Sequence, residues 1–293
     1  MHETEPVFRQ NSASNALPEL FDAHNHLHDE RFGTHAANIL DQAKSVGVKR
    51  MVVNGSCEED WPEVARLAAG NSIVIPSYGL HPWYHHQRGP CWLDHLRDYL
   101  RNPEAGVGEI GLDRWKQDLP YEEQEDVFLA QWELARKLNR PASLHCLKAW
   151  GHLLELLQQH PGPECGFLLH SYGGPVEMIP AFVKLGAYFS FPGYYMHERK
   201  EKQQNTFKAV PADRLLIETD APDQLLPKSY NLYPLVDSDG NPLNHPANLA
   251  AIYTFTATLR GLTGDELEQR IKENFHRLFA DKKTGGHARP PVE

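Results

Sequence analysis

The feature that most constrains the fold is a repeated alternation of short apolar runs with longer helical patterns. The apolar runs lie at residues 20–23, 50–53, 73–78, 106–110, 141–144, 166–169, 188–191 and 215–217. Helical patterns follow them at residues 35–46, 62–69, 92–101, 121–138, 149–160, 175–185 and 199–210, and then, after a loop rich in proline and asparagine, at 247–259 and 264–279. Near-continuous apolar strands that alternate with helices indicate a parallel sheet with both faces covered.

Eight strand-helix units in one chain predict a single closed α/β barrel. The composition shows no break along the 293 residues, and barrels of the TIM type, (β/α)8, use about 250 residues as one domain. A doubly wound open sheet is the alternative, but no G-x-G-x-x-G or Walker-type loop follows the first run. We therefore expect a barrel over residues 18–283, with flexible polar termini at 1–17 and 284–293.

Composition narrows the classes of function and the cellular location. The chain has 29 Lys and Arg against 39 Asp and Glu, a formal net charge of -10, which argues against a broad basic surface that tracks nucleic acid. Its four cysteines form no C-x-x-C pair, so neither a disulfide framework nor a thiolate zinc site is expected. No apolar run approaches the ~20 residues that cross a bilayer, and the acidic start does not look like a secretory signal. We expect a cytoplasmic protein with no membrane partner.

Metal-binding residue types occur where the predicted strands end. In a barrel of this kind the active site lies at the C-terminal ends of the strands, and five of the runs lead into such residues: His24, His26, Glu109, His145, His170 and Asp220. His24 and His26 alternate along one strand, so both imidazoles can face one ion. The alternative interpretation, that all of these are hydrogen-bonded core histidines or helix caps, does not explain ligand-type residues at so many strand ends.

A ligand set of this size predicts two divalent ions, because a carboxylate can bridge two metals through its two oxygens. We expect Glu109 to be that bridge, with one ion held by His24, His26, Glu109 and Asp220 and the other by Glu109, His145 and His170. The mixed nitrogen and oxygen ligands suit zinc, manganese or magnesium. Two such ions polarise a phosphoryl oxygen and activate a bound water. Asp220 can take the proton from that water, so Glu109 and Asp220 are the expected catalytic residues.

Other polar residues near the strand ends carry less specific signals. His81 precedes Pro82 after the third run and could orient a substrate or hold its own loop. Glu218 is expected to face inward behind the ligands, and Asp223 to cap a turn. The remaining loop histidines favour a solvated surface around the mouth of the barrel: His28, His85, His86 and His197.

Six short motifs stand at the strand ends. They are Phe-Asp-Ala-His-Asn-His-Leu at 21–27, Gly-Leu-His-Pro at 79–82, Gly-Glu-Ile-Gly-Leu-Asp at 108–113, Leu-His-Cys at 144–146, His-Ser-Tyr-Gly-Gly at 170–174 and Leu-Ile-Glu-Thr-Asp-Ala-Pro at 216–222. Together these motifs resemble those of the TatD family of metal-dependent hydrolases, within the amidohydrolase superfamily, and the resemblance extends over about residues 20–280. It implies a deoxyribonuclease-like phosphodiesterase, often acting on single strands from the 3′ end, with the six ligands placed as above.

The expected substrate rim departs from the family pattern. After His145 the family carries an Arg, an acidic residue and Ala, whereas this chain has Cys-Leu-Lys-Ala at 146–149. Lys148 can still meet a phosphate, but as a point charge without the fork of an arginine. Arg114 and Trp115 stand where the family has an aromatic pair, and His245 stands where it has Glu or Ser. The expected substrate contacts are His81, Arg114, Lys148 and Glu218.

Three functions remain open at this point. The first is a 3′–5′ exonuclease-like phosphodiesterase, acting on nucleic-acid ends or on a small phosphoester. The second keeps the metal site but cleaves an ester or an amide, as a D-aminoacyl-tRNA deacylase does. The third is a non-catalytic metal-binding or docking protein, which the complete ligand set disfavours. Two divalent ions would attract a phosphodiester locally, so the acidic net charge favours a short strand end over an extended duplex.

Overall fold

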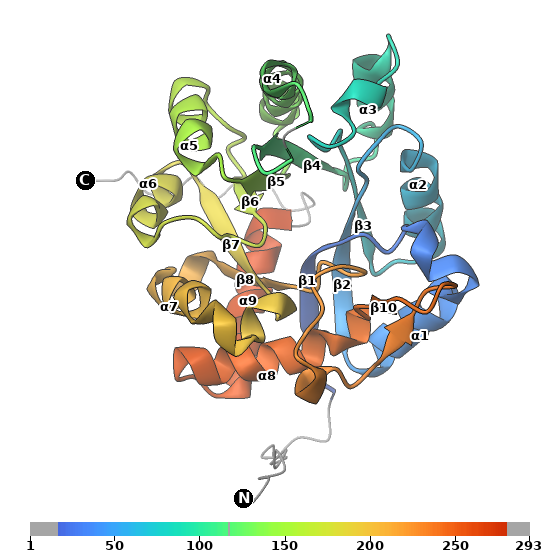
Figure 1. Ribbon diagram of the computed structural model, residues 1–293, viewed down its shortest axis with the longest axis vertical. Coiled ribbons are helices and arrows are strands. Elements are labelled where there is room, and N and C mark those ends of the chain that lie inside the picture. Colours follow the sequence, from blue (N-terminus) through green and yellow to red (C-terminus); the bar gives the residue numbers. More distant parts are fainter. Residues whose placement is uncertain (1–16, 117, 280–293) are drawn as a thin grey trace, which may run out of the picture.

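The computed structural model describes residues 17–116 and 118–279, and its core is a barrel of eight parallel strands (Figure 1). Neighbouring strands pair in the order of the sequence. The strands are β1 Leu20–Asn25, β2 Val48–Asn54, β3 Val74–Tyr78, β4 Gly106–Asp113, β5 Ala142–Leu147, β6 Phe167–Leu169, β7 Ala187–Pro192 and β8 Leu215–Glu218. The predicted TIM-type barrel is confirmed. Most of the predicted flexible termini, residues 1–16 and 284–293, lies outside the described residues.

Hydrogen bonds between the first and last strands close the barrel. The backbone amide of Asp220 donates to the carbonyl of His24 at 3.0 Å. The buried carboxylate of Asp22 accepts from the backbone amide of Thr219 at 2.9 Å and from its hydroxyl at 2.6 Å. These bonds place the residues that follow β8 directly beside the H-x-H segment of β1.

Helices surround the strands, as Figure 1 shows. A last helix, α9 (Gly264–Phe279), packs against β1 and β8, where the Asn274 amide group donates to the carbonyls of Ala212 and Leu215 at 2.8 Å each. Among the helices in the described part of the chain, none is long and apolar enough to cross a bilayer. The helices that follow the strands in turn are α1 Ala36–Ser45, α2 Trp61–Gly70, α3 Trp92–Tyr99, α4 Tyr121–Leu138, α5 Trp150–Gln159, α6 Ile179–Lys184, α7 Glu201–Ala209 and α8 Leu249–Arg260.

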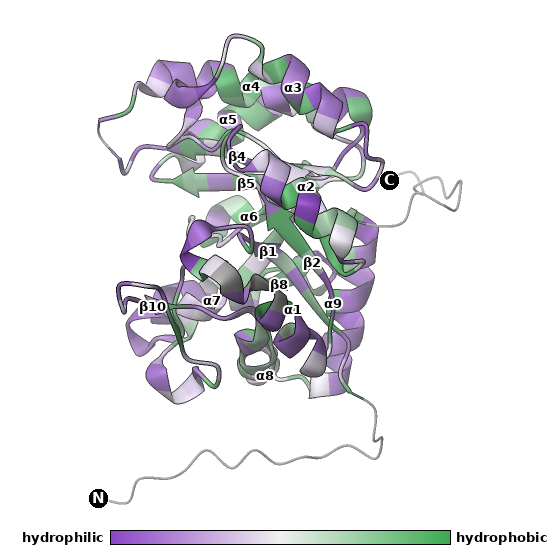
Figure 2. Cartoon of the chain, turned by 90° about the vertical axis from the view of Figure 1, so that its right-hand side faces the viewer, coloured by the Kyte–Doolittle hydropathy of each residue, from purple (hydrophilic) through white to green (hydrophobic). Residues whose placement is uncertain are grey.

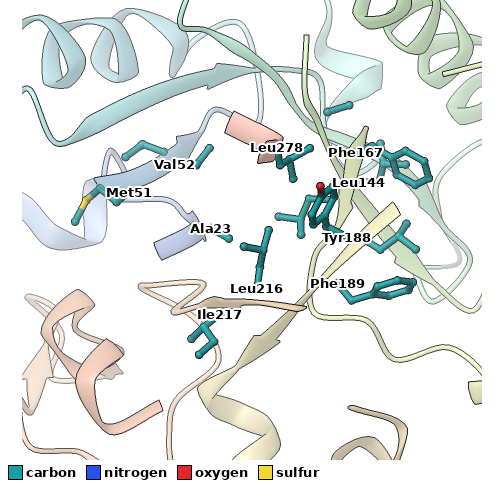
Figure 3. Close-up of a cluster of buried hydrophobic side chains, with 14 of the residues drawn as sticks. Ala23, Met51, Val52, Leu144, Phe167, Tyr188, Phe189, Leu216, Ile217 and Leu278 are labelled. Atoms are coloured by element: carbon teal, nitrogen blue, oxygen red, sulfur yellow. The ribbon is translucent and has the colours of Figure 1, made fainter. Parts of the chain in front are cut away.

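Apolar side chains from the strands form the core. Figure 3 shows part of it, where Met51 of β2, Leu144 of β5, Phe167 of β6 and Phe189 of β7 lie in one cluster with Leu278 of α9. Each of these side chains is buried, and a fully buried side chain of this size stabilises the fold by about 1.5 to 3 kcal/mol. Figure 2 shows hydrophobic strands in the interior and hydrophilic faces on many of the surrounding helices. The packed barrel therefore holds the strand ends in fixed positions.

Six strands continue beyond the ends that the apolar runs predict, and three of them do so by two or three residues. β1 reaches Asn25, β4 reaches Asp113 and β5 reaches Leu147. The prediction stopped near the first polar side chains, whereas backbone pairing does not depend on side-chain polarity and continues through them. As a result His145 lies inside β5, just as Glu109 lies inside β4 as predicted, and the backbone on both sides fixes the direction of each side chain.

The long loop after β8 contains a small hairpin that the sequence did not predict. Its strands are β9 (Leu235–Val236) and β10 (Pro242–Leu243), which pair antiparallel. The carboxylate of Asp237 accepts hydrogen bonds from two backbone amides of the connecting turn, those of Asp239 and Asn241. Strands of two residues are too short to produce a recognisable apolar alternation.

Candidate metal centre

The six predicted ligands converge at the C-terminal ends of the strands. They lie in β1, β4 and β5 or directly after β1, β6 and β8: His24, His26, Glu109, His145, His170 and Asp220. Five of them are buried, and His26, the most accessible, exposes only 14% of its side chain. Parallel strands present their carboxyl ends at the same rim of the barrel, which brings residues distant in sequence together.

One oxygen of Glu109 faces the two histidines of the H-x-H segment. Glu109 Oε2 lies 3.3 Å from His24 Nε2 and 3.1 Å from His26 Nε2. Both nitrogens lie 3.6 Å from Asp220 Oδ1 and 3.3 Å from each other. Two imidazole nitrogens and two carboxylate oxygens that converge in this way are a donor set suited to a divalent transition metal.

The other oxygen of Glu109 faces two different histidines. Glu109 Oε1 lies 3.0 Å from His145 Nδ1 and 2.7 Å from His170 Nε2. These two nitrogens are 3.4 Å apart. A single carboxylate therefore spans two separate pairs of imidazoles, which is the arrangement that a bridging ligand requires.

Hydrogen bonds behind two of the rings decide which ring nitrogen is free. His26 Nδ1 donates to the backbone carbonyl of Asn54 at 2.8 Å, and His145 Nε2 donates to Asp113 Oδ2 at 2.9 Å. In each ring the remaining nitrogen faces Glu109 and is the one that would present a lone pair to a metal ion. Partners of this kind orient metal-binding histidines and raise their basicity. The residues present therefore fit a divalent ion on each side of Glu109.

Asn54 also contacts His24 and leaves one of its own atoms unsatisfied. Asn54 Nδ2 lies 3.0 Å from His24 Nδ1, while Asn54 Oδ1 is buried without a hydrogen-bond partner among the described residues. An ion on His24 Nε2 would require a proton on Nδ1, and the amide oxygen of Asn54 would accept that proton once the amide group turned over. The unsatisfied oxygen thus also fits a bound cation.

His81 lies beside the same carboxylate but offers a proton instead of a lone pair. His81 Nε2 is 3.4 Å from Glu109 Oε1, and its Nδ1 accepts the backbone amide of Trp83 at 3.1 Å. The ring proton is therefore on Nε2. Burial lowers the pKa of His81 to about 4, so the ring is neutral at pH 7. This polarity suits hydrogen bonding to a bound substrate better than it suits metal ligation.

Glu218 lies behind the centre and takes part in a buried network. Its carboxylate accepts from Ser171 Oγ at 2.5 Å and from the hydroxyl of Ser190. Gln224 extends the network, because its amide group donates to Asp220 Oδ2 at 2.7 Å and to the Ser171 hydroxyl. The network holds Asp220 in place from behind. Direct contact of Glu218 with a substrate stays a prediction.

The two carboxylates of the centre differ in their electrostatic surroundings. Burial favours the neutral form of Glu109, but the surrounding imidazoles, above all those of His170 and His81, hold its pKa well below the ordinary value. For Asp220, burial and the nearby carboxylate of Glu218 together raise the pKa to about 7, against the attraction of His170. The Glu109 carboxylate is therefore charged throughout the neutral range, while the pKa of Asp220 lies within that range, where proton exchange is effective.

A cavity of about 1030 Å³ opens from the centre toward the loops that follow β1, β2 and β3. Arg31 is the only Lys or Arg among the described residues that line it, and its guanidinium donates to the carboxylates of Asp29 and Asp223 at 2.8 Å each. The remaining charged groups of these loops are mostly acidic and include Glu30, Glu59, Asp60 and Glu63. This side of the mouth therefore carries net negative charge.

The two predicted phosphate contacts lie on another part of the rim. The backbone amide of Arg114 donates to the carbonyl of Leu147 at 2.9 Å, which joins the loops after β4 and β5. The Arg114 guanidinium stacks on the ring of Tyr121, 4.1 Å from its centroid. Lys148 follows β5 and is exposed. Neither basic residue is among the described residues that line the cavity, and their contact with phosphate stays a prediction.

Sequence reasoning missed three residues that support the ligands. Asn54 and Asp113 are polar residues at the ends of the buried strands β2 and β4, a signal that could have identified them. Gln224 lies in the loop after β8 with a φ of +50°, and nothing in the sequence indicates that its amide group reaches Asp220.

Comparisons with known proteins bear on this site. The family model described as TatD related DNase matches residues 21–280. The metal-dependent hydrolase YjjV of Escherichia coli K12 is 29% identical over 263 residues, covering 89% of this chain and 97% of that protein. The 3′-5′ ssDNA/RNA exonuclease TatD of Pantoea vagans is 30% identical over 263 residues, covering 89% and 99%. The crystal structure of Escherichia coli YjjV has a TM-score of 0.80 at 28% identity, covering 89% of this chain and 97% of that one. The chain belongs to the TatD family of metal-dependent hydrolases.

Proposed function

We propose that this enzyme hydrolyses phosphodiester bonds at nucleic-acid ends with two divalent ions, in the manner of a 3′–5′ exonuclease. The observation that carries the proposal is the position of Glu109, whose two oxygens face two separate pairs of imidazoles. Pairs of metal ions are typical of nucleases and phosphatases. A nucleic-acid substrate is supported by the printed name of the Pantoea vagans relative, which describes a 3′-5′ ssDNA/RNA exonuclease.

The donor distances support one distribution of the proposed ligands over two ions. The proposed ligands are His24, His26, Glu109 and Asp220 for one ion and Glu109, His145 and His170 for the other. Mg²⁺, Mn²⁺ or Zn²⁺ bound there would polarise a phosphoryl oxygen and lower the pKa of a bound water to about 7.

The protein groups around the ligands perform the proton transfer and the positioning. Asp220 accepts the proton of the attacking water, and the bond from Gln224 to Asp220 Oδ2 at 2.7 Å holds the carboxylate in one orientation. His81 donates a hydrogen bond from its Nε2–H group to a phosphoryl oxygen and keeps its proton, because its Nδ1 already accepts the amide of Trp83. Glu218 keeps Gln224 in position through the hydroxyl of Ser171.

A metal-reconstitution assay tests the proposed function. Enzyme stripped with a chelator and reloaded with Mg²⁺, Mn²⁺ or Zn²⁺ is assayed on a 5′-labelled single-stranded oligonucleotide, on bis(4-nitrophenyl) phosphate and on an acyl ester. We expect metal-dependent shortening of the oligonucleotide from its 3′ end, since the two-ion site favours phosphodiester chemistry. Hydrolysis of the acyl ester alone would overturn the proposal in favour of an acyl hydrolase.

The bridging role of Glu109 is tested by Glu109→Gln, which keeps the size of the side chain but leaves a single acceptor oxygen. We expect phosphodiesterase activity to fall by more than the about 10- to 100-fold that is typical when a partner of a metal ligand is lost. Metal content measured by mass spectrometry should fall with it. Glu177→Gln, at an exposed position outside the centre, is the matched control and should change neither quantity.

A further inference from the structure

The mouth of the barrel is divided by charge. The loops after β1 and β2, together with Asp223 after β8, line the cavity with carboxylates, and Arg31 there is already paired with Asp29 and Asp223. The described residues of the loops after β4 and β5 instead expose three cations, Arg114, Lys116 and Lys148, against one carboxylate, Asp118. A polyanion is repelled on the first side and attracted on the second. A strand that reaches the centre therefore approaches over the loops after β4 and β5.

Two tryptophans lie where the cavity meets this approach, next to a proposed metal ligand: Trp83, in the loop after β3, also lines the cavity, and Trp115 lies in the loop after β4. The ring of Trp83 lies 6.1 Å from the ring of His145, and the ring of Trp115 lies 6.3 Å from that of Trp83, measured between centroids. Trp115 is 55% exposed, which is unusual for a large aromatic side chain that touches another. Lys116 Nζ lies 4.9 Å from the centroid of the Trp83 ring. Aromatic faces and a cation thus continue outward from the centre.

Hydrogen bonds to Asp113 connect Trp83, Trp115 and Lys116 to the metal centre. Its Oδ2 accepts from Trp83 Nε1 at 2.6 Å and from His145 Nε2 at 2.9 Å. Its Oδ1 accepts from the backbone amides of Trp115 at 2.6 Å and Lys116 at 3.1 Å. One carboxylate therefore fixes both a proposed metal ligand and the exposed aromatic segment, so the distance between them is set by the fold.

We infer that Trp83, Trp115 and Lys116 form the surface that binds the unpaired strand next to the scissile phosphate, an inference that rests on the proposed function. A nucleobase stacks on the exposed face of Trp115, as bases do on aromatic side chains in single-strand binding proteins. Lys116 contributes its charge to the adjoining phosphate. The acidic cavity beyond the centre receives only the terminal nucleotide, because a further phosphate would enter among carboxylates that outnumber the one arginine of the described lining.

The test compares two substrates in the metal-loaded enzyme. Trp115→Ala should lower kcat/KM for a single-stranded oligonucleotide by about ten-fold more than for bis(4-nitrophenyl) phosphate, mainly through KM, since loss of one stacked base weakens binding by that order. Trp115→Phe should recover most of the loss. Leu232→Ala, which removes another exposed apolar side chain from the loop after β8, is the control and should leave the ratio unchanged.

A charge reversal tests the cationic part independently of any effect of Trp115 on folding. Lys116→Glu should raise KM for the oligonucleotide strongly at low salt and weakly at high salt, because phosphate neutralisation is salt-dependent. Lys184→Glu, at the end of α6, makes the same change in net charge and should not. If the wild type is active and neither Trp115→Ala nor Lys116→Glu changes the ratio of kcat/KM between the two substrates, this inference is wrong while the proposed function stands. Absence of metal-dependent nucleic-acid cleavage by the wild type overturns the proposed function as well.

Discussion

At the scale of single residues, Asp113 is one carboxylate that holds both His145 and Trp83 from behind the metal centre. Burial opposes its ionisation, but the hydrogen bonds from His145 and Trp83 lower the pKa of Asp113 to about 2. The group is therefore charged throughout the neutral range and accepts both of these donors on one oxygen. A charged acceptor on His145 strengthens the lone pair that this ring presents to the centre.

Asp113→Asn should weaken metal binding without unfolding the protein. The amide is neutral and cannot stabilise the His145 ring to the same degree, so we expect affinity for Zn²⁺ or Mn²⁺ to fall by about 10- to 100-fold. Isothermal titration calorimetry of the metal-free protein measures this. Asp265→Asn, at an exposed position in α9, serves as the control. Equal affinities in Asp113→Asn and the wild type would show that Asp113 does not support a ligand.

His245 gives the fold a dependence on pH that does not involve the metal centre. The side chain is 3% exposed, its Nδ1 accepts the amide of Ala247 at 2.9 Å, and its Nε2 donates to Gln42 Oε1 at 2.8 Å. Burial lowers the pKa of His245 to about 4. The unfolded chain binds a proton near pH 6.5, whereas the folded chain does so only near pH 4.

The free energy of unfolding should therefore fall as the pH decreases from 6.5 toward 4. The contribution of His245 is fully present above pH 6.5 and is lost at a rate of about 1.4 kcal/mol per pH unit within that window. Urea unfolding of the wild type and His245→Gln at pH 7 and pH 5 measures it. The wild type should lose more stability than the variant between these two values. Equal losses in both proteins would contradict the assignment.

At the scale of elements, β4 depends on a glycine where it passes β5. Gly111 has a φ of +149°, and a Cβ atom there would lie 1.9 Å from the backbone oxygen of His145. An L side chain fits neither the backbone conformation nor the space. The close approach keeps β4 paired with β5 through Asp113 and Leu147, which positions Glu109 and His145 relative to each other.

Gly111→Ala should destabilise the protein by about 2 to 5 kcal/mol, the combined cost of overpacking and backbone strain. Gly151→Ala is a matched control in α5, where an added Cβ atom meets nothing within 4 Å. That control should be neutral or stabilise the helix by up to about 1 kcal/mol. Chemical denaturation of both variants measures the difference. A Gly111→Ala variant as stable as the control would show that the two strands can move apart freely.

Apolar runs predict where strands exist but not where they end. All eight predicted strands occur in the barrel, and the predicted helix over 121–138 matches α4 without change. The predicted end of β4 lies three residues too early. The last residues of the strand include Gly111 and Asp113, which interrupt the apolar pattern. The β9–β10 hairpin was missed because its strands contain two residues each.

At the scale of the whole molecule, the metal centre depends on the complete fold. Its proposed ligands come from five strands or the residues just after them. Along the chain, at least one helix with its loops separates each of these strands from the next. A metal that binds only this arrangement stabilises the folded state. The stability of the barrel and the occupancy of the centre are therefore linked.

Addition of Zn²⁺ or Mn²⁺ to the stripped protein should raise Tm. A free concentration of 100 times Kd adds about 2.7 kcal/mol, which corresponds to roughly 5 to 10 °C for a chain of this size. Differential scanning fluorimetry measures the shift, and the Glu109→Gln variant should show a smaller one. If metal binds the wild type but leaves its Tm unchanged, the ions also bind the unfolded chain.

The positions of the site residues could be predicted from the sequence to different degrees. The six ligand positions follow from a rule about strand ends, and the structure brings all six together. The proton on His81 Nε2 could not be predicted, because it depends on the backbone amide of Trp83 in a loop. The acidic cavity could not be predicted either, since its lining comes from four loops, those after β1, β2, β3 and β8, whose proximity is a property of the closed barrel.

The bond between Asp22 and Thr219 joins residues 197 positions apart, and it closes the barrel where the proposed ligands meet. Proteins are synthesised from the N-terminus, so the H-x-H segment exists long before Asp220 does. A chain still under synthesis, or one cut short before β8, cannot assemble the complete set of ligands. Hydrolytic activity therefore begins only with the finished barrel, and unfinished chains near nucleic acid carry no complete centre.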